Sequence, residues 1–433
     1  MNKKLNTWTV SGLMIGPILG SGIVFLPPLA YEKLGEHAFL AWLIIMVLGA
    51  LFASIFARMS LTAGSNEGIS LLVGSMLGTR FRELSSNCLT AAVFFGPVAV
   101  AITAAGFIHS ALPEGLSPGT AVLSLAVLLV CHGFVALGAA AMGRFVLVLS
   151  TATALLLIGG SIPTLINAPA VEIPLTLPEP GMLGSTLLLL FWAIIGWEIL
   201  GSYIEDVKDP GRTLMRAMKI SMAAILVIYL LTTLALQTYY RGMAVPADMN
   251  VLLIPIMGTH ARTVFSILAA SLCLCTMISF VGAVTRQLKA RSTAGLLPPF
   301  LKKTFAAQLL LLLANGLVLL ARTADLLSTD AIVGVANGFF IVNALLGLAA
   351  GFRFLKSPLL RFWISILILM LTFLLFFSKP AALAALAAVV AVTLLKPVPA
   401  VSNEGNAKEE VLDKRIKETA AVTEGYEKSG CRQ

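Results

Sequence analysis

The stretch Ile15-Gly16-Pro17-Ile18-Leu19-Gly20-Ser21-Gly22-Ile23 lies inside the first long apolar segment of the chain, and Phe191-Trp192-Ala193-Ile194-Ile195-Gly196-Trp197-Glu198 lies inside the sixth. Both place glycine at the middle of a segment long enough to cross a membrane, and the first also holds a proline. Glycine and proline weaken the helical hydrogen-bond ladder. Backbone groups left unpaired in hydrocarbon cost several kcal/mol each, so a break at this depth must line a polar cavity. We therefore predict two interrupted helices that face one cavity.

The composition predicts an all-α integral membrane protein. Of the 433 residues, 58% are hydrophobic and only 12% are charged, whereas soluble domains carry roughly 25% charged residues. Apolar segments of about twenty residues without alternation are typical of transmembrane helices rather than of the strands of a membrane barrel. The sequence predicts twelve transmembrane helices, at about residues 7–31, 38–59, 85–111, 119–139, 145–166, 183–206, 217–238, 263–287, 305–321, 329–351, 359–378 and 380–396.

The positions of Lys and Arg predict the orientation. With the N-terminus in the cytoplasm, most of them fall in cytoplasmic loops, as the positive-inside rule requires. We expect a multi-pass protein of the cytoplasmic (inner) membrane with both termini in the cytoplasm. The formal net charge of +9 then reflects topology, and no nucleic-acid partner is expected. Residues 1–396 are predicted to form the transmembrane domain, and residues 397–433 a disordered cytoplasmic tail.

The interrupted segments are five apart in the order of segments. Because five is odd, a repeat of the first five segments in the next five would be inverted in the membrane. We predict inverted repeats over about residues 7–166 and 183–351, followed by two extra helices over about residues 359–396. Interrupted helices at matching positions of inverted halves indicate a substrate site near the middle of the membrane.

Chain direction assigns a chemical role to each break. The outer half of the first helix starts near Gly22, and its free N–H groups suit an anion such as an α-carboxylate. The outer half of the sixth helix ends near Ile195, and its free carbonyls suit an ammonium group. The alternative is that the small residues only pack helices closely. The predicted zwitterion site consists of Gly20, Ser21, Gly22, Ile23, Trp192, Ala193, Ile194, Ile195, Gly196 and, deep in the tenth segment, Asn337.

Other residues are predicted to gate the path or to couple it to protons. Glu198 is a carboxylate inside the membrane, where charges are costly and usually functional; the alternative is a structural carboxylate that accepts bonds from free backbone N–H groups. Trp197 either gates the break or packs outward. Glu205 lies in a charged loop, which either forms an inner hinge with ion pairs to Arg286 or Lys289, or is only a solvated face. No metal site is predicted.

These motifs resemble those of the amino acid–polyamine–organocation (APC) transporters. Gly20-Ser21-Gly22-Ile23 with Pro27 resembles their first-helix motif, and Phe191-Trp192-x-x-Ile195-Gly196-x-Glu198 their sixth-helix motif. The stretch Glu205-Asp206-Val207-Lys208-Asp209-Pro210-x-Arg212 resembles the loop that follows. Ala336-Asn337-Gly338-x-Phe340-Ile341 is similar to the branch of bacterial amino acid exporters.

The resemblance covers about residues 7–395. It implies a five-plus-five inverted-repeat core with two extra helices, alternating access around the breaks, and a backbone site at residues 20–23 and 192–196. Many members of that family carry a lysine inside the fifth helix. Residues 145–166 carry no charge, which argues against lysine-based coupling here.

We therefore predict secondary transport of small neutral amino acids such as methionine, leucine, isoleucine and valine, because the pocket segments offer no obvious buried charge to pair with a charged substrate. Proton-coupled efflux (antiport) is favoured, and uptake or exchange coupled to protons or sodium is the alternative. For sodium, the eighth segment offers Ser271, Thr276 and Ser279. A membrane-embedded enzyme is disfavoured by dispersed histidines and carboxylates, and a channel by the lack of a continuous polar pore. The expected partners are the amino acid, protons and the lipid bilayer, with no cofactor.

Overall fold

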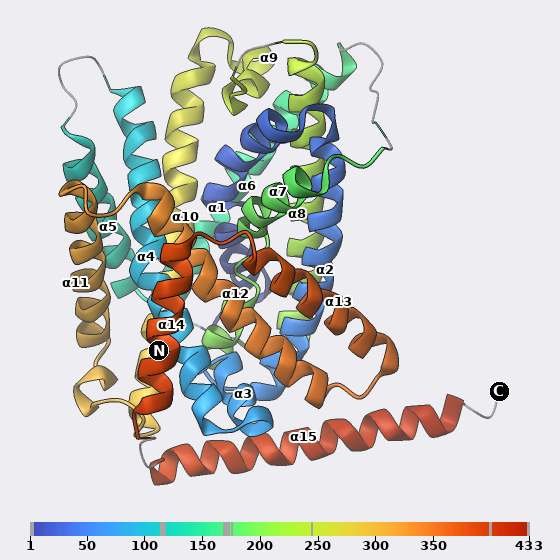
Figure 1. Cartoon of the computed structure of the whole chain (residues 1–433), viewed down its shortest axis with the longest axis vertical. Coiled ribbons are helices and arrows are strands. Elements are labelled where there is room, and N and C mark those ends of the chain that lie inside the picture. The colour runs from blue at the N-terminus through green and yellow to red at the C-terminus, as the bar shows by residue number, and fades with distance from the viewer. Residues whose placement is uncertain are drawn as a thin grey trace.

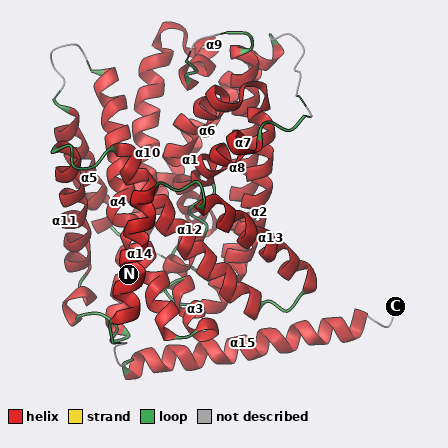
Figure 2. Cartoon of the chain, viewed as in Figure 1, coloured by secondary structure: helices red, strands yellow, loops and turns green. Residues whose placement is uncertain are grey.

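The computed structural model describes residues 4–112, 118–167, 174, 176–243, 246–397 and 401–430. Within these ranges the regular structure is helical, apart from one isolated β-bridge between Leu5 and Val207 (Figure 2). Two short 3-10 helices, Phe191–Ala193 and Glu198–Asp206, follow α7. The α-helices are α1 (Thr7–Leu34), α2 (Ala38–Ala63), α3 (Ile69–Leu77), α4 (Thr79–Ala111), α5 (Thr120–Ala136), α6 (Ala139–Ile166), α7 (Pro180–Leu190), α8 (Pro210–Tyr240), α9 (Ile254–Met257), α10 (Ala261–Thr293), α11 (Thr304–Thr323), α12 (Thr329–Phe354), α13 (Pro358–Leu375), α14 (Pro380–Leu395) and α15 (Asn403–Gly430).

Most of these helices are long and apolar. Among the described residues, nine helical segments are long and apolar enough to cross a membrane, and one of them, Thr7–Ala63, contains both α1 and α2. The helices α5 and α14 are apolar but shorter. Each apolar segment predicted from the sequence overlaps one of these helices.

Some boundaries differ from the prediction. The helices α4, α6 and α8 begin at Thr79, Ala139 and Pro210, about a turn or two before the predicted apolar segments. An apolar window detects only the part of a helix that lies in hydrocarbon, whereas helical hydrogen bonding continues into the polar region beyond it. The short helix α3, in the loop before α4, was not predicted.

The helix α1 lies at the centre of the bundle, where it packs against α6, α8 and α10, while α4 packs against α10 and α12 (Figure 1). Close approach of α1 to α6 depends on glycine. A Cβ atom on Gly12 would lie 2.7 Å from the carbonyl oxygen of Gly143. Small residues allow this kind of backbone contact between helices.

A proline shapes the wall that α4 presents to the interior. Pro97 has no N–H, so the carbonyl of Val93, four residues earlier, loses its helical partner. Asn315 of α11 replaces that partner: its Nδ2 donates to the carbonyl oxygens of Val93 and Phe94 at 2.9 Å each. A side chain of α11 thus supplies the hydrogen bond that the backbone of α4 lacks at Pro97.

The tail was predicted to be disordered, and this is wrong for residues 403–430, which form α15. The helix α15 lies across the end of the bundle that carries α3, opposite the end that carries α9 (Figure 1). Its start is capped by Ser402, whose Oγ accepts from the N–H of Gly405 at 3.2 Å, and Leu412 is buried. Packing against the bundle therefore stabilises a helix that the charged sequence of the tail would not be expected to form by itself. Residues 398–400 and 431–433 lie outside the described residues.

Candidate functional site

The two predicted breaks are present and they meet. In α1 the helix is interrupted at Gly20, with φ 4° and ψ −127°. The segment Pro180–Asp206 changes from α-helix to 3-10 helix at Phe191 and is interrupted again at Gly196, whose φ of 127° favours glycine. A Cβ atom on Gly196 would lie 3.2 Å from the side chains of Pro17 and Ile18, so the second break lies against the α1 residues that precede the first.

Side chains from two other helices bind the backbone at the break in α1. The N–H of Ser21 donates to Thr276 Oγ1 of α10 at 3.0 Å. The hydroxyl of Tyr229, on α8, donates to the carbonyl oxygen of Ile18 at 2.7 Å. The Tyr229 ring is buried and stacks on Trp42 of α2, with 4.4 Å between ring centroids. The break is therefore held in place by α8 and α10.

Trp192 connects the two breaks. Its Nε1 donates to Ser21 Oγ at 3.0 Å, and its ring meets the Phe340 ring edge-on, with centroids 6.3 Å apart and an interplanar angle of 88°. Phe340 in turn packs against Phe280, with 5.1 Å between centroids. An indole thus spans the gap between α1 and α12.

Trp192 lines two cavities. The first has about 340 Å³ of empty space, and its lining includes Pro17, Gly96, Ile195, Thr276, Phe280 and Phe340. The second has about 320 Å³, and its lining includes Phe25, Thr103, Val333 and Asn337. Among the described residues, no charged side chain lines either cavity.

The predicted site residues fall into two groups. Trp192 and Ile195 line the first cavity. Ser21 does not line it but accepts a hydrogen bond from Trp192. The side chains of Ala193, Ile194 and Trp197 line a separate hollow between α2 and α8.

The glycines at the α1 break are tightly enclosed. Gly20 faces Thr276, and a Cβ atom on Gly22 would lie 2.6 Å from the Tyr229 hydroxyl. Ile23 is buried in the core, and the amide oxygen of Asn337 has no hydrogen-bond partner among the described residues. The structure therefore shows the close packing that was weighed for these small residues, at the point where α1 is interrupted. Their role in binding a substrate stays a prediction.

Sequence reasoning missed several residues of the site. Tyr229, Phe280 and Pro97 were not named, and Thr276 was considered only as a sodium ligand. Phe340 appeared only within a family motif. The aromatic residues of α8, α10 and α12 carry no local signal, because helices buried in a bundle are apolar on every face.

Glu198 is buried beside the second break. Its Oε2 accepts from the N–H of Gly196 at 2.9 Å, while its Oε1 has no hydrogen-bond partner within the described ranges. This bond matches the structural alternative, a carboxylate that binds a free backbone N–H. The second oxygen is available to a further partner. In the part of the chain that the structure describes, no three His, Cys, Asp or Glu residues are grouped to hold a metal ion.

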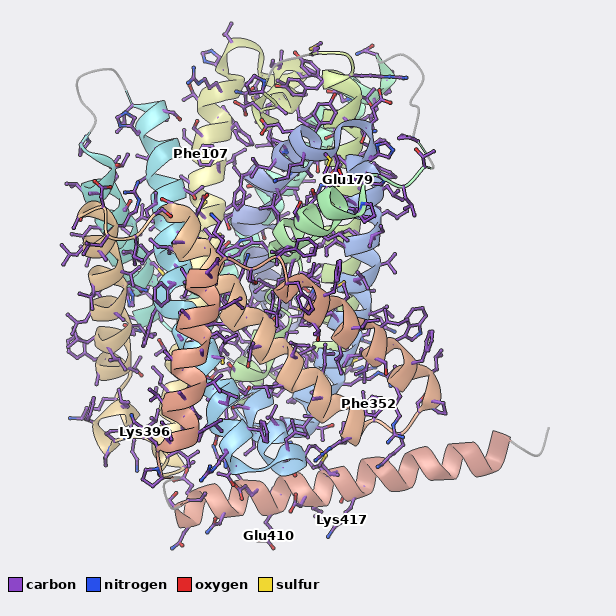
Figure 3. The ribbon with its side chains drawn as sticks, viewed as in Figure 1. Phe107, Glu179, Phe352, Lys396, Glu410 and Lys417 are labelled. Carbon is purple, nitrogen blue, oxygen red and sulfur yellow. The ribbon has the colours of Figure 1, made fainter. Side chains whose placement is uncertain are left out.

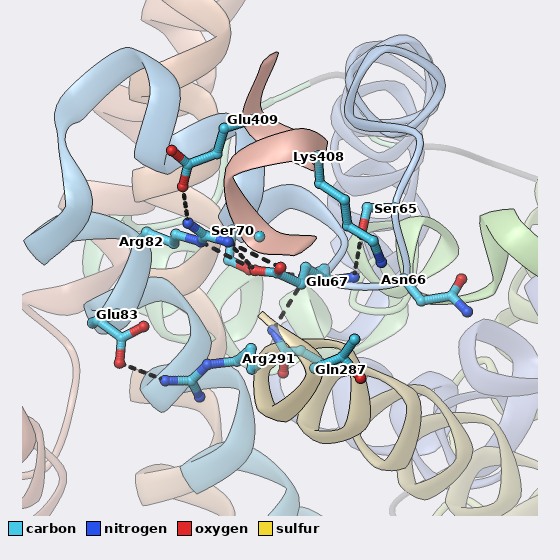
Figure 4. A network of polar contacts seen from close by, with 12 residues as sticks. Ser65, Asn66, Glu67, Ser70, Arg82, Glu83, Gln287, Arg291, Lys408 and Glu409 are labelled. Carbon is cyan, nitrogen blue, oxygen red and sulfur yellow. Dashed lines mark hydrogen bonds and ion pairs between the residues drawn. The ribbon is translucent and has the colours of Figure 1, made fainter. Parts of the chain in front are cut away.

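The end of the segment Pro180–Asp206 lies in a polar network near α3 and α15. Arg286 Nε lies 2.7 Å from Asp206 Oδ2, and the Arg286 guanidinium lies over the Tyr203 ring at 4.7 Å. Glu205 instead accepts from the backbone N–H of Asn66 and pairs with Lys408 of α15, both at 3.2 Å. Asn66 and Lys408 lie beside the Glu67–Arg82 pair (Figure 4).

A helical bundle with two interrupted helices that meet at an apolar cavity defines a membrane transport protein. The family model described as amino acid permease matches residues 5–377. The chain belongs to this family, within the APC transporters, as its motifs predicted. It is a multi-pass membrane protein and a transporter rather than an enzyme.

Three curated relatives support this assignment. The chain is 24% identical over 373 residues to the L-methionine/branched-chain amino acid exporter YjeH of Escherichia coli strain K12, an alignment that covers 80% of this chain and 85% of that protein. It is 22% identical over 386 residues to the uncharacterized amino acid permease YecA of Bacillus subtilis strain 168, covering 83% and 87%. It is 24% identical over 289 residues to the cadaverine/lysine antiporter of Escherichia coli strain K12, covering 64% of each chain.

Proposed function

We propose that the protein exports small neutral amino acids, such as methionine, leucine, isoleucine and valine, across the cytoplasmic membrane by alternating access. One observation carries the proposal: the two broken helices meet at an apolar cavity that no charged side chain of the described residues lines. A buried lysine or glutamate side chain of a substrate would need a charged partner there, since unpaired charges are expensive to bury.

Substrate recognition divides between backbone and side chains. The N–H groups of α1 beyond Gly20 suit the α-carboxylate, and the carbonyls near Trp192 and Ile195 suit the α-ammonium group. Phe280 and Phe340 then contact the substrate side chain. Trp192, which lines both cavities, serves as the gate between them. Asn337, with its unpaired amide oxygen, supplies a polar contact on the far side of that gate.

The proposed topology has twelve transmembrane helices, arranged as two inverted repeats of five with α13 and α14 added. The proposed orientation places both termini in the cytoplasm. Two contacts support it: Leu5 pairs with Val207 near the chain start, and α15 contacts α3. Segments that must share one side of the membrane are thus neighbours.

Direction and coupling are proposed on different grounds. Efflux is favoured because a relative that aligns over most of both chains is named as an exporter of methionine and branched-chain amino acids. Exchange is the second candidate, because another relative is named as an antiporter. Proton coupling is proposed through Glu198, whose free oxygen adjoins the second break. Trp197, Glu205 and Arg286 are proposed to move with the gate.

The test uses purified protein in proteoliposomes loaded with radiolabelled leucine. We expect saturable leucine efflux. Methionine, isoleucine and valine should compete with leucine for transport, whereas lysine and glutamate should have no effect. A pH gradient should accelerate it. Equal transport of lysine or cadaverine would overturn the substrate assignment, and saturable uptake without efflux would reverse the direction.

A further inference from the structure

The helix α15 is fastened to the end of the bundle at several points. The N–H of Ser402, just before its first turn, donates to the carbonyl oxygen of Ala294 at 2.9 Å, and the Ser402 hydroxyl donates to the carbonyl oxygen of Thr293 at 3.1 Å. One turn further, Gly405 lies against Ala294. Leu412 is 1% exposed. The start of α15 is therefore anchored to the end of α10.

Adjacent residues of α15 bind two different parts of the transporter. Lys408 Nζ lies 3.2 Å from Glu205 Oε1, at the end of the segment Pro180–Asp206. Glu409 pairs with Arg82, in the first turn of α4 (Figure 4). Further along, Asp413 accepts from the Ser75 hydroxyl of α3 at 3.1 Å. The helix thus bridges an interrupted helix and its neighbours.

Lys408 and Glu409 lie next to a buried ion pair and a close backbone contact. Arg82 and Glu67 are buried, at 1% and 0% exposure, and form a two-oxygen ion pair at 2.8–2.9 Å. Beside Glu67, a Cβ atom on Gly201 would lie only 2.7 Å from the Cα of Gly68. The loop between α2 and α3 is therefore pressed against the inner half of the interrupted segment.

We propose that α15 is an autoinhibitory latch that holds the cytoplasmic end of the transport path closed. This inference rests on the proposed function, because alternating access requires that end to open. Opening moves the inner half of the segment Pro180–Asp206 away from α4 and α10. Lys408 and Glu409 join these parts, so α15 must release at least one of them first.

The ion pairs that hold α15 are individually weak, so α15 slows opening rather than preventing it. Each partly exposed ion pair stabilises by about 0–1 kcal/mol, or up to roughly fivefold in an equilibrium constant. The two ion pairs and the burial of Leu412 together slow opening. Since exposed pairs are screened by salt, the brake weakens as ionic strength rises.

The first test compares two double variants of the full chain in proteoliposomes. Lys408→Gln with Glu409→Gln removes both bridging charges. Glu410→Gln with Lys417→Gln is the matched control: both residues are exposed and point away from the bundle (Figure 3), and the net charge again stays constant. The first variant should transport roughly fivefold faster than the wild type, and the control at the wild-type rate. Equal rates for both variants, at a measurable wild-type flux, would overturn the latch.

The second test locks the latch. Ser75→Cys with Asp413→Cys, in a background with Cys431→Ser, is joined by a short bis-methanethiosulfonate cross-linker. Cross-linking should slow transport severalfold, and reduction should restore it. A cross-linked protein that transports as fast as its reduced form would refute the proposal.

A third readout does not depend on the substrate. Ser202 is buried where the loop meets the inner half of the interrupted segment. Labelling of Ser202→Cys by an impermeant maleimide, in inside-out vesicles, should be severalfold faster in the Lys408→Gln/Glu409→Gln background. Faster labelling without any amino acid flux would support the latch and sink the proposed function. Unchanged labelling together with unchanged flux would sink the latch alone.

Discussion

Replacing Gly22 with alanine should damage the α1 break through one specific contact. The added methyl group would lie 2.6 Å from the Tyr229 hydroxyl oxygen and 3.7 Å from Cδ1 of Trp192. The first distance is well inside van der Waals contact, so something must move. Tyr229 is poorly able to move, because its ring stacks on Trp42 and its hydroxyl binds the Ile18 carbonyl.

The magnitude follows from these two contacts. Adding a methyl group to a close-packed site costs about 1–3 kcal/mol. Displacing the hydroxyl also loses a buried hydrogen bond worth roughly 1 kcal/mol. Gly22→Ala should therefore destabilise the protein by about 2–4 kcal/mol. Tyr229→Phe alone should cost only about 1 kcal/mol, because the stacked ring remains.

The double variant decides whether this contact is responsible. In Tyr229→Phe the atom that clashes is absent, so Gly22→Ala should cost roughly 1–2 kcal/mol less than in the wild type. Thermal unfolding in detergent reports stability, and leucine efflux from proteoliposomes reports function. Gly106→Ala, on α4 with nothing near its Cβ position, is the control, and it should leave stability unchanged or raise it by up to about 1 kcal/mol. Strictly additive effects of the two substitutions would refute the reasoning.

Three further substitutions probe other parts of the site. Asn315→Leu leaves the Val93 carbonyl without a donor and should destabilise the protein by about 1–3 kcal/mol, measured by thermal unfolding. Trp192→Phe keeps an aromatic ring but loses the bond to Ser21, so the KM for efflux should rise roughly fivefold. Phe340→Ala opens the first cavity and should shift competition toward bulkier substrates such as phenylalanine.

Matched controls come from the exposed face of α11. Leu317 is 69% exposed, so Leu317→Ala should leave the unfolding temperature nearly unchanged, in contrast to Asn315→Leu. Phe305 is 75% exposed, so Phe305→Ala should leave the substrate preference as it is. Unchanged competition in Phe340→Ala would mean that this ring does not contact the substrate side chain. An unchanged KM in Trp192→Phe would mean that the bond to Ser21 is not part of the bound state.

Local backbone chemistry explains why much of the site could be predicted. The breaks at Gly20 and Gly196 follow from residues within a few positions of each, and a break in hydrocarbon has to face a cavity. Trp192 lies on the cavity wall and Arg286 pairs with Asp206, but the roles of both residues in binding and gating stay predictions. Glu205 was expected to pair with Arg286 or Lys289 of α10, but it pairs with Lys408 of α15. This partner was missed because the tail was predicted to be disordered.

By itself, the sequence determined the class of protein, the apolar segments and the two interruptions, since length, hydropathy and glycine placement act locally. Only the tertiary structure decided which side chains close the break and the cavity. Thr276 and Tyr229 come from helices far along the chain, and nothing in an all-round apolar helix marks the face that will point inward. The same holds for α15: a charged, glycine-containing tail has little reason to be ordered until Leu412 is buried and Glu409 meets Arg82. Contacts between distant segments supply the free energy that orders these side chains and α15, and these contacts exist only after the bundle has folded.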